Sequence, residues 1–317
     1  MPEGRNRLVD YLVYVALRVA AAFVQMFSPK AVYLAVGRLG NAWYRLHRRH
    51  RLRATDHVRA SFPNWSQERV QQTVKGSLRN LAYLGIEALL TARLMNRWSW
   101  RRCVVLGDIR EVCRILLERQ TGAIFISGHF GGWEVAGYAM AALGFTGYAV
   151  ARPLDNPYLN EYLLGSRQKA GLNILDKRGA TEQMDDILGN RNYVGFIADQ
   201  DAGPRGVFVD FFGRQASTYK APSLVAMRHK APIIVAYGRR LGEQYRFELG
   251  FQRIIYPHEW ADKEDPIRWI TQEYTAALED IIRSSPDQYL WIYRRWKTRP
   301  RDQQPIENAP NRSAIPK

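Results

Sequence analysis

Residues 123 to 134 read AIFISGHFGGWE, and this stretch decides the fold. AIFIS (123 to 127) is a short continuous apolar run that is typical of a buried strand, and the glycines after it end the run. WEVAGYAMAAL (133 to 143) then has the length and the apolar content of a helix that packs on a sheet. A strand, a tight turn and a helix in succession indicate an α/β layer fold.

The same alternation continues along the chain. Further short apolar or alternating runs predict strands at 146–151, 193–199, 232–238 and 245–251. Helical patterns are expected at 66–93, 109–119, 134–143, 157–170, 181–190 and 217–229. We therefore predict one α/β domain over residues 61 to 301, with a mixed, largely parallel sheet flanked by helices. Residues 302 to 317, rich in Pro, Asn and Gln, are expected to form a flexible tail.

The N-terminus predicts a membrane-associated helical segment over residues 1 to 60. Leu8 to Phe27 is an apolar stretch long enough to reach across about 30 Å of hydrocarbon. Asp10 and Arg18 interrupt it, and Arg18 at mid-helix is costly in a bilayer, so spanning and lying on the surface both stay open. Residues 1 to 60 carry eleven Lys/Arg and three Asp/Glu, a net of +8. A basic flank of this kind favours an anionic membrane surface, and a buried core helix is the alternative.

Composition limits the class of partner. The chain has 317 residues, of which 46 are Lys or Arg and 30 are Asp or Glu, so its formal charge is +16 and its pI is near 10.0. This balance indicates a polyanionic partner, which could be nucleic acid, anionic lipid or an acidic carrier protein. The two cysteines, Cys103 and Cys113, predict neither a disulfide framework nor a zinc site. No P-loop and no G-x-G-x-x-G motif indicates a nucleotide or flavin cofactor.

His129 is the first candidate for chemistry, because it directly follows the 123–127 strand. Open α/β sheets place their sites at the carboxyl ends of strands. Glu134, five positions later in the first turn of the next helix, could return toward the imidazole and orient it. The pair would then act as a general base with its supporting carboxylate. The alternative is an ordinary capping or surface pair, and Ser127 leaves a serine nucleophile open as well.

Three other stretches carry candidate polar residues. YAVARPLDNPYLN (148–160) places Arg152 and Asn156 after the next strand, where they could bind substrate, although Arg152 could instead pair with Asp155. GFIADQDAGPRG (195–206) places Asp199 and Asp201 at another strand end. QYLWIYRRWKTRP (288–300) mixes aromatic and basic side chains; core or membrane-interface packing is favoured there over nucleic-acid stacking, and no nucleic-acid partner is expected.

These motifs together resemble the bacterial lipid A late acyltransferases of the lauroyl/myristoyl type, within the lysophospholipid acyltransferase superfamily, and their phosphatidylinositol mannoside acyltransferase relatives. The resemblance runs in order through HFGGWE (129–134), RPLDNP (152–157), ADQDAG with GVFVDFFG (198–213) and QYLWIYRRWKTRP (288–300). It implies an enzyme at the cytoplasmic face of a bacterial inner membrane. Such an enzyme moves a fatty acyl chain from an acyl carrier protein or acyl-CoA thioester to a hydroxyl of a membrane lipid, without a metal or cofactor.

The resemblance also assigns roles to residues. His129 matches the catalytic histidine and Glu134 its paired carboxylate, while one of Asp199 and Asp201 is implied to lie near that histidine. Arg167, within SRQKAG (166–171), matches an arginine near the reacting oxyanion. The glycine turn or an arginine would supply the oxyanion donors. The acceptor stays open between lipid A precursors, other glycolipids and glycerophospholipids, and a non-enzymatic basic membrane-binding protein is the remaining alternative.

Overall fold

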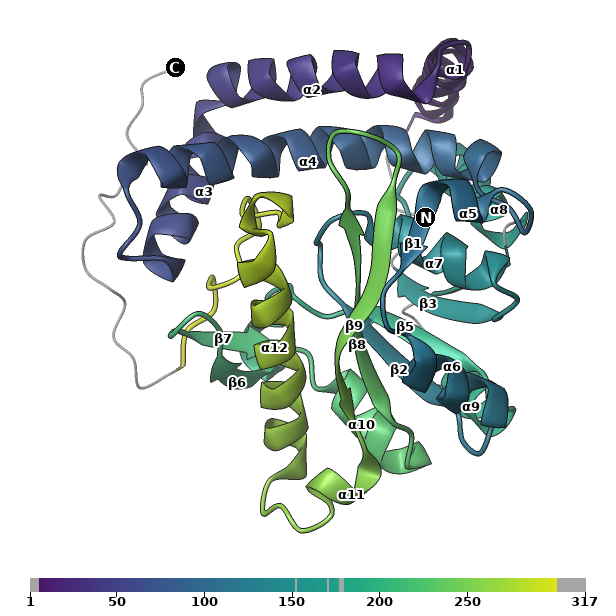
Figure 1. Ribbon diagram of the computed structural model, residues 1–317, viewed down its shortest axis with the longest axis vertical. Coiled ribbons are helices and arrows are strands. Elements are labelled where there is room, and N and C mark those ends of the chain that lie inside the picture. Colours follow the sequence, from purple (N-terminus) through teal and green to yellow (C-terminus); the bar gives the residue numbers. More distant parts are fainter. Residues whose placement is uncertain (1–5, 152, 170, 177–179, 301–317) are drawn as a thin grey trace.

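A seven-stranded sheet forms the centre of the molecule (Figure 1). The computed structural model describes residues 6–151, 153–169, 171–176 and 180–300, so Arg152 and the expected tail at 302–317 lie outside the described residues. The strands are β1 (Val104–Leu106), β2 (Ala123–Ser127), β3 (Gly147–Ala151), β4 (Leu172–Asp176), β5 (Tyr193–Ile197), β8 (Ile233–Arg240) and β9 (Phe247–Ile255). Their order is β1-β9-β8-β2-β5-β3-β4.

The sheet is mixed and mostly parallel, as predicted. β2 pairs in parallel with β5 and with β8, and β3 pairs in parallel with β4 and with β5. β8 and β9 form an antiparallel pair, and β1 runs parallel to β9 at the edge. A separate hairpin is formed by β6 (Val207–Asp210) and β7 (Gln215–Thr218). β2 and β5 therefore lie near the middle of the sheet, with their carboxyl ends at the same edge.

Helices cover both faces of the sheet. They are α6 (Arg110–Glu118), α7 (Trp133–Ala142), α8 (Pro157–Lys169), α9 (Ala180–Gly189), α10 (Ala221–His229), α11 (Pro257–Trp260) and α12 (Pro266–Ser284). Side chains alternate across a strand, and β2 shows it: Ile124 and Ile126 pack in the cluster with α10 and α12, whereas Ala123 and Phe125 pack with α6 and α7. The α6 and α7 face is the one on which the site described below opens.

The sequence-predicted elements are mostly confirmed, with one correction. The helix expected at 217–229 begins only at Ala221, because residues 215 to 218 form β7. β1, β4, the β6–β7 hairpin and α12 were not predicted. β1 has only three residues, and β6 and β7 have four each, which is too short for alternation to be read from the sequence.

The N-terminal residues form a helical layer along one edge of the molecule, at the top of Figure 1. Its helices are α1 (Arg7–Gln25), α2 (Pro29–Leu46), α3 (Arg48–Ser61), α4 (Gln67–Leu94) and α5 (Trp100–Cys103). Buried polar contacts connect α2 and α4 to the sheet: Glu87 of α4 accepts hydrogen bonds from Tyr33 of α2 and from Arg240 of β8, both at 2.6 Å. The layer is thereby fixed to the same body as the sheet.

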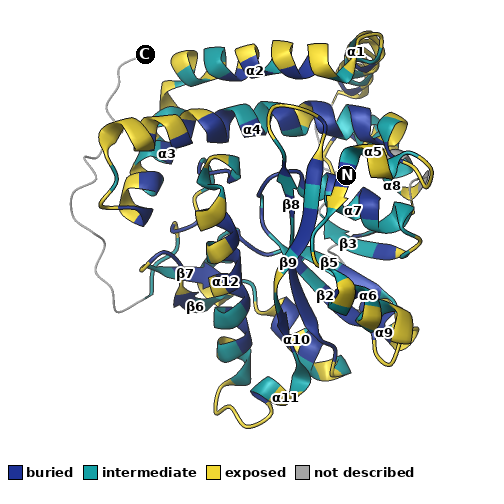
Figure 2. Ribbon diagram, in the orientation of Figure 1, coloured by how far each residue is buried: buried dark blue, intermediate teal, exposed yellow. Residues whose placement is uncertain are grey.

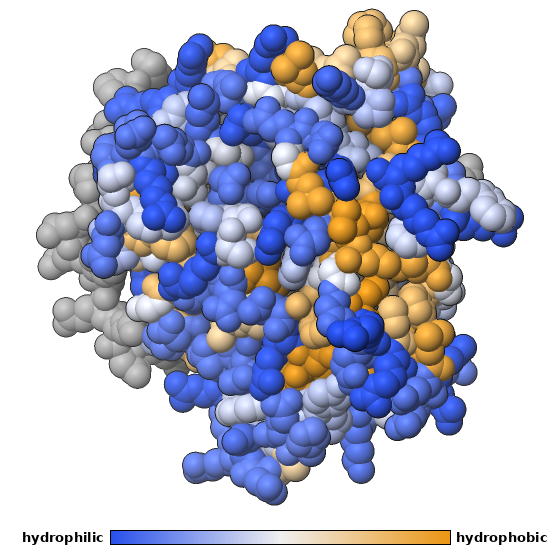
Figure 3. Space-filling model, in the orientation of Figure 1, coloured by the Kyte–Doolittle hydropathy of each residue, from blue (hydrophilic) through white to orange (hydrophobic). Residues whose placement is uncertain are grey.

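α1 has two different faces. On one face, the Arg18 guanidinium donates to the Tyr14 hydroxyl at 2.7 Å and lies 5.0 Å from the centre of the Tyr162 ring of α8. On the other face, large apolar side chains such as Val19 (64 % exposed) and Phe23 (60 % exposed) are uncovered. Exposed residues recur along α1 in Figure 2, and apolar side chains gather over α1 at the upper right of Figure 3. By length and composition α1 could cross a membrane, yet only 11 % of its apolar window is buried within the protein. Its apolar face therefore lacks a protein partner among the described residues.

Candidate active site

The turn between β2 and α7 holds His129, and this turn is fixed by hydrogen bonds from its own backbone. Each N–H from residue 129 to 132 is used within the protein: His129 to Asp199 Oδ2 (2.8 Å), Phe130 to Gly128 O (2.7 Å), Gly131 to Gln288 O (3.0 Å) and Gly132 to Gly238 O (2.8 Å). Gly131 has a φ of +55°, and a Cβ there would lie 2.1 Å from Gly238 O. Only glycine fits at this position.

Asp199 is the carboxylate that pairs with His129. Its Oδ1 lies 2.7 Å from His129 Nδ1, while its Oδ2 accepts the His129 N–H. Burial alone would raise the pKa of Asp199, but the contacts with His129 and the charge of Arg295 lower it below the usual range. An ionised carboxylate can only accept, so Nδ1 donates and Nε2 carries the lone pair. This arrangement makes Nε2 of His129 the basic atom of the site.

Glu134 has a different partner from the one predicted. Its Oε1 lies 2.5 Å from Nη2 of Arg167 on α8, and both side chains are partly buried. The expected contact between Glu134 and His129 is thus replaced by the His129–Asp199 pair. The register explains why: Ser127 of β2 is opposite Ile197 of β5, so residues two positions further along each chain, 129 and 199, also lie opposite.

Two other predicted site residues are used in internal contacts. Asp201 accepts hydrogen bonds from the backbone N–H of Thr298 at 3.2 Å and from its hydroxyl at 2.9 Å, which ties the C-terminal segment to the loop after β5. Asn156 accepts from the Leu159 N–H at 3.1 Å at the start of α8 and donates to the Asp10 carbonyl at 2.9 Å. Neither side chain hydrogen-bonds to His129, and the partners of Asn156 are internal, whereas sequence analysis predicted a substrate contact for it.

Three side chains around His129 were not predicted as site residues. Gln200 Nε2 lies 3.5 Å from His129 Nε2, and the rings of Tyr293 and Trp133 have centroids 4.6 and 4.9 Å from the imidazole centroid. Burial, together with the charge of Asp199, raises the pKa of Tyr293, so its hydroxyl stays protonated and can donate. Gln200 lies inside ADQDAG between the two predicted aspartates, and this position was the available signal.

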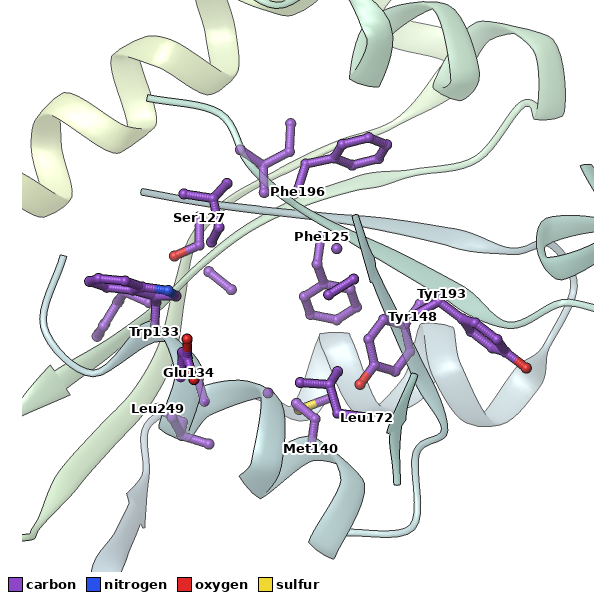
Figure 4. Close-up of a pocket in the computed structure, with 18 of the residues that line it drawn as sticks. Phe125, Ser127, Trp133, Glu134, Met140, Tyr148, Leu172, Tyr193, Phe196 and Leu249 are labelled. Atoms are coloured by element: carbon purple, nitrogen blue, oxygen red, sulfur yellow. The ribbon is translucent and has the colours of Figure 1, made fainter. Parts of the chain in front are cut away.

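An apolar pocket of about 210 Å³ adjoins this turn (Figure 4). It lies between the sheet and α6 and α7, and most of its lining is aliphatic or aromatic, including Phe125, Met140, Tyr148, Leu172, Tyr193 and Phe196. Ser127, Trp133 and Glu134 come together at one end of the view in Figure 4, and Arg167 also lines the pocket. Trp133 lines the pocket and its ring also contacts the imidazole of His129, so this end of the pocket is next to the His129 turn. The shape suits an apolar chain with a polar group at its His129 end.

Further contacts bear on a serine nucleophile at Ser127, on the paired phenylalanines and on a metal site. Ser127 lines the pocket but makes no hydrogen bond to His129 among the described residues, so the imidazole is not arranged to activate it. The two adjacent aromatic residues of GVFVDFFG, Phe211 and Phe212, pack in the core with Tyr289 and Trp291 and do not line the pocket. Within the described part of the chain, no group of three or more His, Cys, Asp or Glu side chains could hold a metal ion.

Comparison with known proteins gives consistent matches over most of the chain. The family model of the bacterial lipid A biosynthesis acyltransferases matches residues 3–298. The lipid A biosynthesis lauroyltransferase of Escherichia coli K12 is 27 % identical over 297 residues, covering 92 % of both chains. The lipid A biosynthesis palmitoleoyltransferase of the same organism is 24 % identical, with the same coverage. A phosphatidylinositol mannoside acyltransferase of Mycobacterium tuberculosis is 25 % identical over 55 % of this chain and 54 % of its own.

Proposed function

The chain belongs to the bacterial lipid A biosynthesis acyltransferases, enzymes that transfer acyl groups, and we propose that it moves a fatty acyl chain from a thioester to a lipid hydroxyl. The proposed acceptor is a lipid A precursor or a related glycolipid. The observation that carries the proposal is the His129–Asp199 pair at the end of an apolar pocket. The residue pair supplies a base, and the pocket supplies room for an acyl chain.

His129 and Asp199 account for the proton transfers. Nε2 of His129 takes the proton of the acceptor hydroxyl while that oxygen attacks the thioester carbonyl carbon. The ionised Asp199 stabilises the imidazolium that results, because its Oδ1 lies 2.7 Å from Nδ1. When the tetrahedral intermediate collapses, the C–S bond breaks and the imidazolium returns the proton to the departing sulfur. A thioester is already activated, so this sequence needs no covalent acyl-enzyme.

The tetrahedral oxyanion needs donors, which the sequence predicted to come from either the glycine turn or an arginine. The N–H groups of residues 129 to 132 are all engaged within the protein, and this favours the arginine. We assign the role to the Arg167 guanidinium, which lines the pocket, with the Gln200 amide beside Nε2 as a second donor. Glu134 then acts by holding Arg167 in place. A bound carboxylate of this kind limits the movement of the guanidinium.

The proposed location is the cytoplasmic face of a bacterial inner membrane. The exposed apolar side of α1 and the net +8 charge of residues 1 to 60 both support attachment to an anionic surface. The acceptor would then be reached without leaving the bilayer. Arg152 keeps its predicted role as a substrate contact, since it lies outside the described residues.

Two experiments test the proposal. Lipids from cells with and without the protein, compared by mass spectrometry, should differ by one acyl chain on a lipid A precursor; an unchanged profile would contradict it. Purified protein should accept an acyl chain from acyl carrier protein more readily than from acyl-CoA, because the acidic carrier presents many charges to a +16 protein. That preference should weaken as salt is raised. Equal or better transfer from acyl-CoA at matched concentration would remove the carrier from the proposal.

A second acceptor class is kept because of one similarity. The match to a phosphatidylinositol mannoside acyltransferase covers about half of this chain. The proposed catalytic pair and the pocket support a proposal about the bond that is made, and they say little about the headgroup. Parallel assays with a lipid A precursor, a phosphatidylinositol mannoside and a lysophospholipid separate these acceptors directly.

A further inference from the structure

A second cavity of about 890 Å³ lies where α1, the end of α4, α7 and α8 meet. It shares no lining residue with the apolar pocket beside His129. We refer to it as the interface cavity. The side chains that define its chemistry are Tyr14, Arg97, Trp98, Tyr158, Glu161 and Tyr162.

The tyrosine wall of the interface cavity is built from two helices. Tyr14 of α1 has its ring 6.1 Å from the rings of both Tyr158 and Tyr162 of α8. Arg18 fixes this arrangement, because its guanidinium donates to the Tyr14 hydroxyl and lies over the Tyr162 ring. The wall therefore consists of aromatic faces that are held in place before any ligand binds.

The cavity also contains one cation and one anion from different walls. Arg97 follows α4 and stacks 4.8 Å from the Trp98 ring, while Glu161 comes from α8. Both are exposed, and neither forms an ion pair with any residue that the structure describes. An arginine recognises phosphate, and a carboxylate beside aromatic faces recognises an ammonium group. Together they suit a zwitterion better than an uncharged sugar or a purely anionic group.

The position of the cavity indicates where such a zwitterion comes from. Trp98 is 80 % exposed at the rim, and α1 presents uncovered apolar side chains such as Leu12 (56 % exposed) and Val19. Tyrosine and tryptophan concentrate at the level of lipid headgroups, with apolar side chains deeper. We propose that the interface cavity binds the headgroup of a zwitterionic phospholipid, with its phosphate at Arg97 and its ammonium at Glu161 and the ring of Tyr158, over which Arg18 does not lie. This lipid is a docking ligand, distinct from the acyl donor and the acceptor.

Binding of a short-chain lipid tests the proposal without measuring acyl transfer. The full chain is labelled with fluorotryptophan, its Trp98 resonance is assigned with Trp98→Phe, and dihexanoyl phosphatidylethanolamine is added below its micelle concentration. We expect a saturable shift of the Trp98 signal. Arg97→Gln and Glu161→Gln should each weaken binding about tenfold, the loss of one charge-assisted contact. Arg101→Gln, an exposed arginine stacked on Trp100 outside the cavity, should bind as the wild type does.

Headgroup preference gives the second measurement. Wild type should bind phosphatidylethanolamine more tightly than phosphatidylglycerol, which lacks the ammonium, and Glu161→Gln should remove that preference. The proposal is overturned by the absence of a saturable shift, by equal binding of the two lipids, or by Arg97→Gln and Glu161→Gln both behaving like Arg101→Gln. A shift produced only by a phosphorylated glucosamine disaccharide would assign the cavity to a glycolipid acceptor instead. None of these outcomes depends on the proposed acyl transfer.

Discussion

The turn that carries His129 (residues 128–132), which we call the catalytic turn because of its proposed role, and helix α1 are both conspicuous in the sequence. In the structure they differ in how far the rest of the protein covers them. The turn is held on every side: four consecutive backbone N–H groups are bonded within the protein, and the Asp199 side chain is 1 % exposed. α1 is held on one side by Arg18 and tyrosines, while its other side is apolar and open. The region proposed to perform the chemistry is thus completed by the fold itself, whereas the region proposed to bind a membrane leaves its apolar side uncovered among the described residues.

The largest expected effect on acyl transfer comes from a substitution in the catalytic turn, the region that contacts within the protein hold on every side. His129→Ala should lower acyl transfer by about 10²- to 10⁴-fold, because the general base is lost. Far-UV circular dichroism and thermal unfolding should remain close to wild type, since the turn is fixed by backbone contacts. A purified, folded variant with near-normal turnover would mean that another group is the base.

The next comparison separates the two carboxylates of the site. Asp199→Asn should reduce turnover by about 10²-fold or more, because a neutral amide neither fixes the Nδ1–H tautomer nor stabilises the imidazolium. Glu134→Gln keeps a hydrogen-bond acceptor for Arg167, so turnover should fall only about tenfold. This is the difference between a charged and a neutral hydrogen bond. Turnover of both variants is measured under the same conditions. The reverse order of effects would restore Glu134 as the partner of the base.

The ionised state of Asp199 adds a pH criterion. Its pKa is lowered in the folded protein, so this carboxylate stabilises the fold above the unfolded value, near pH 4, and that contribution is lost only as pH falls below it. The carboxylate of Asp199 should therefore contribute a nearly constant amount to the difference in free energy of unfolding between wild type and Asp199→Asn from pH 7 down to about pH 5. Convergence of their unfolding curves at neutral pH would contradict an ionised Asp199.

The sequence was informative about local pattern and silent about which strands are neighbours. The 123–127 strand, the turn at 128–132 and the following helix were all predicted, and His129 followed from them. Glu134 was chosen because it is close in sequence, yet the partner comes from β5, seventy residues away, through a pairing that the sequence does not display. The family resemblance implied that one of the two aspartates lies near the histidine, and the strand register with its contacts shows that it is Asp199.

The apolar pocket and the partners of Arg18 were beyond the sequence for the same reason. Residues from at least seven helices and strands line the pocket, so no single stretch of sequence indicates it. Arg18 looked like a defect in an apolar helix, but the Tyr162 ring that it covers belongs to α8, far along the chain. The aromatic segment at 288–300 was better predicted, since Tyr289, Trp291 and Trp296 are buried in the core as favoured.

Membrane binding should depend on the charge of the uncovered face of α1. Val19→Glu with Phe23→Glu places two carboxylates on the uncovered face of α1, where each side chain contributes roughly 1.5 to 3 kcal/mol when buried in an apolar phase. We expect at least a tenfold loss of partitioning to anionic vesicles in a flotation assay, with turnover on detergent-dispersed acceptor largely kept.

Leu117→Glu is the matched control for that variant. Leu117 lies on α6 and is 70 % exposed, so its substitution makes one exposed apolar-to-carboxylate change, of the kind made twice on α1, at a site away from that helix. It should leave vesicle binding unchanged. Retention of the α1 variant on membranes through a high-salt wash would move the anchor to the aromatic 288–300 segment, and retention only at low salt would move it to the basic residues of α3.

The smallest effect concerns His57, which connects α3 of the N-terminal helical layer to the segment that holds the catalytic turn. His57 of α3 has its Nδ1 2.8 Å from the Trp291 carbonyl, to which it donates, and the segment around Trp291 also holds the catalytic turn. Burial lowers the pKa of His57; Arg214 and Arg53 act in the same direction, and the Trp291 hydrogen bond and Asp56 oppose them. The folded protein therefore binds fewer protons here than the unfolded chain.

Stability should consequently fall as pH drops below about 6.5, the unfolded value, and the loss should end below the folded pKa. His57→Asn keeps a donor near the Trp291 carbonyl but cannot titrate, so its free energy of unfolding should decline less steeply, by up to about 1.4 kcal/mol per pH unit. Urea unfolding in detergent between pH 8 and pH 5 measures both slopes. The exposed His258→Asn should keep the wild-type slope. Identical slopes for His57→Asn and wild type would show that acid sensitivity arises outside the contact between α3 and the catalytic turn.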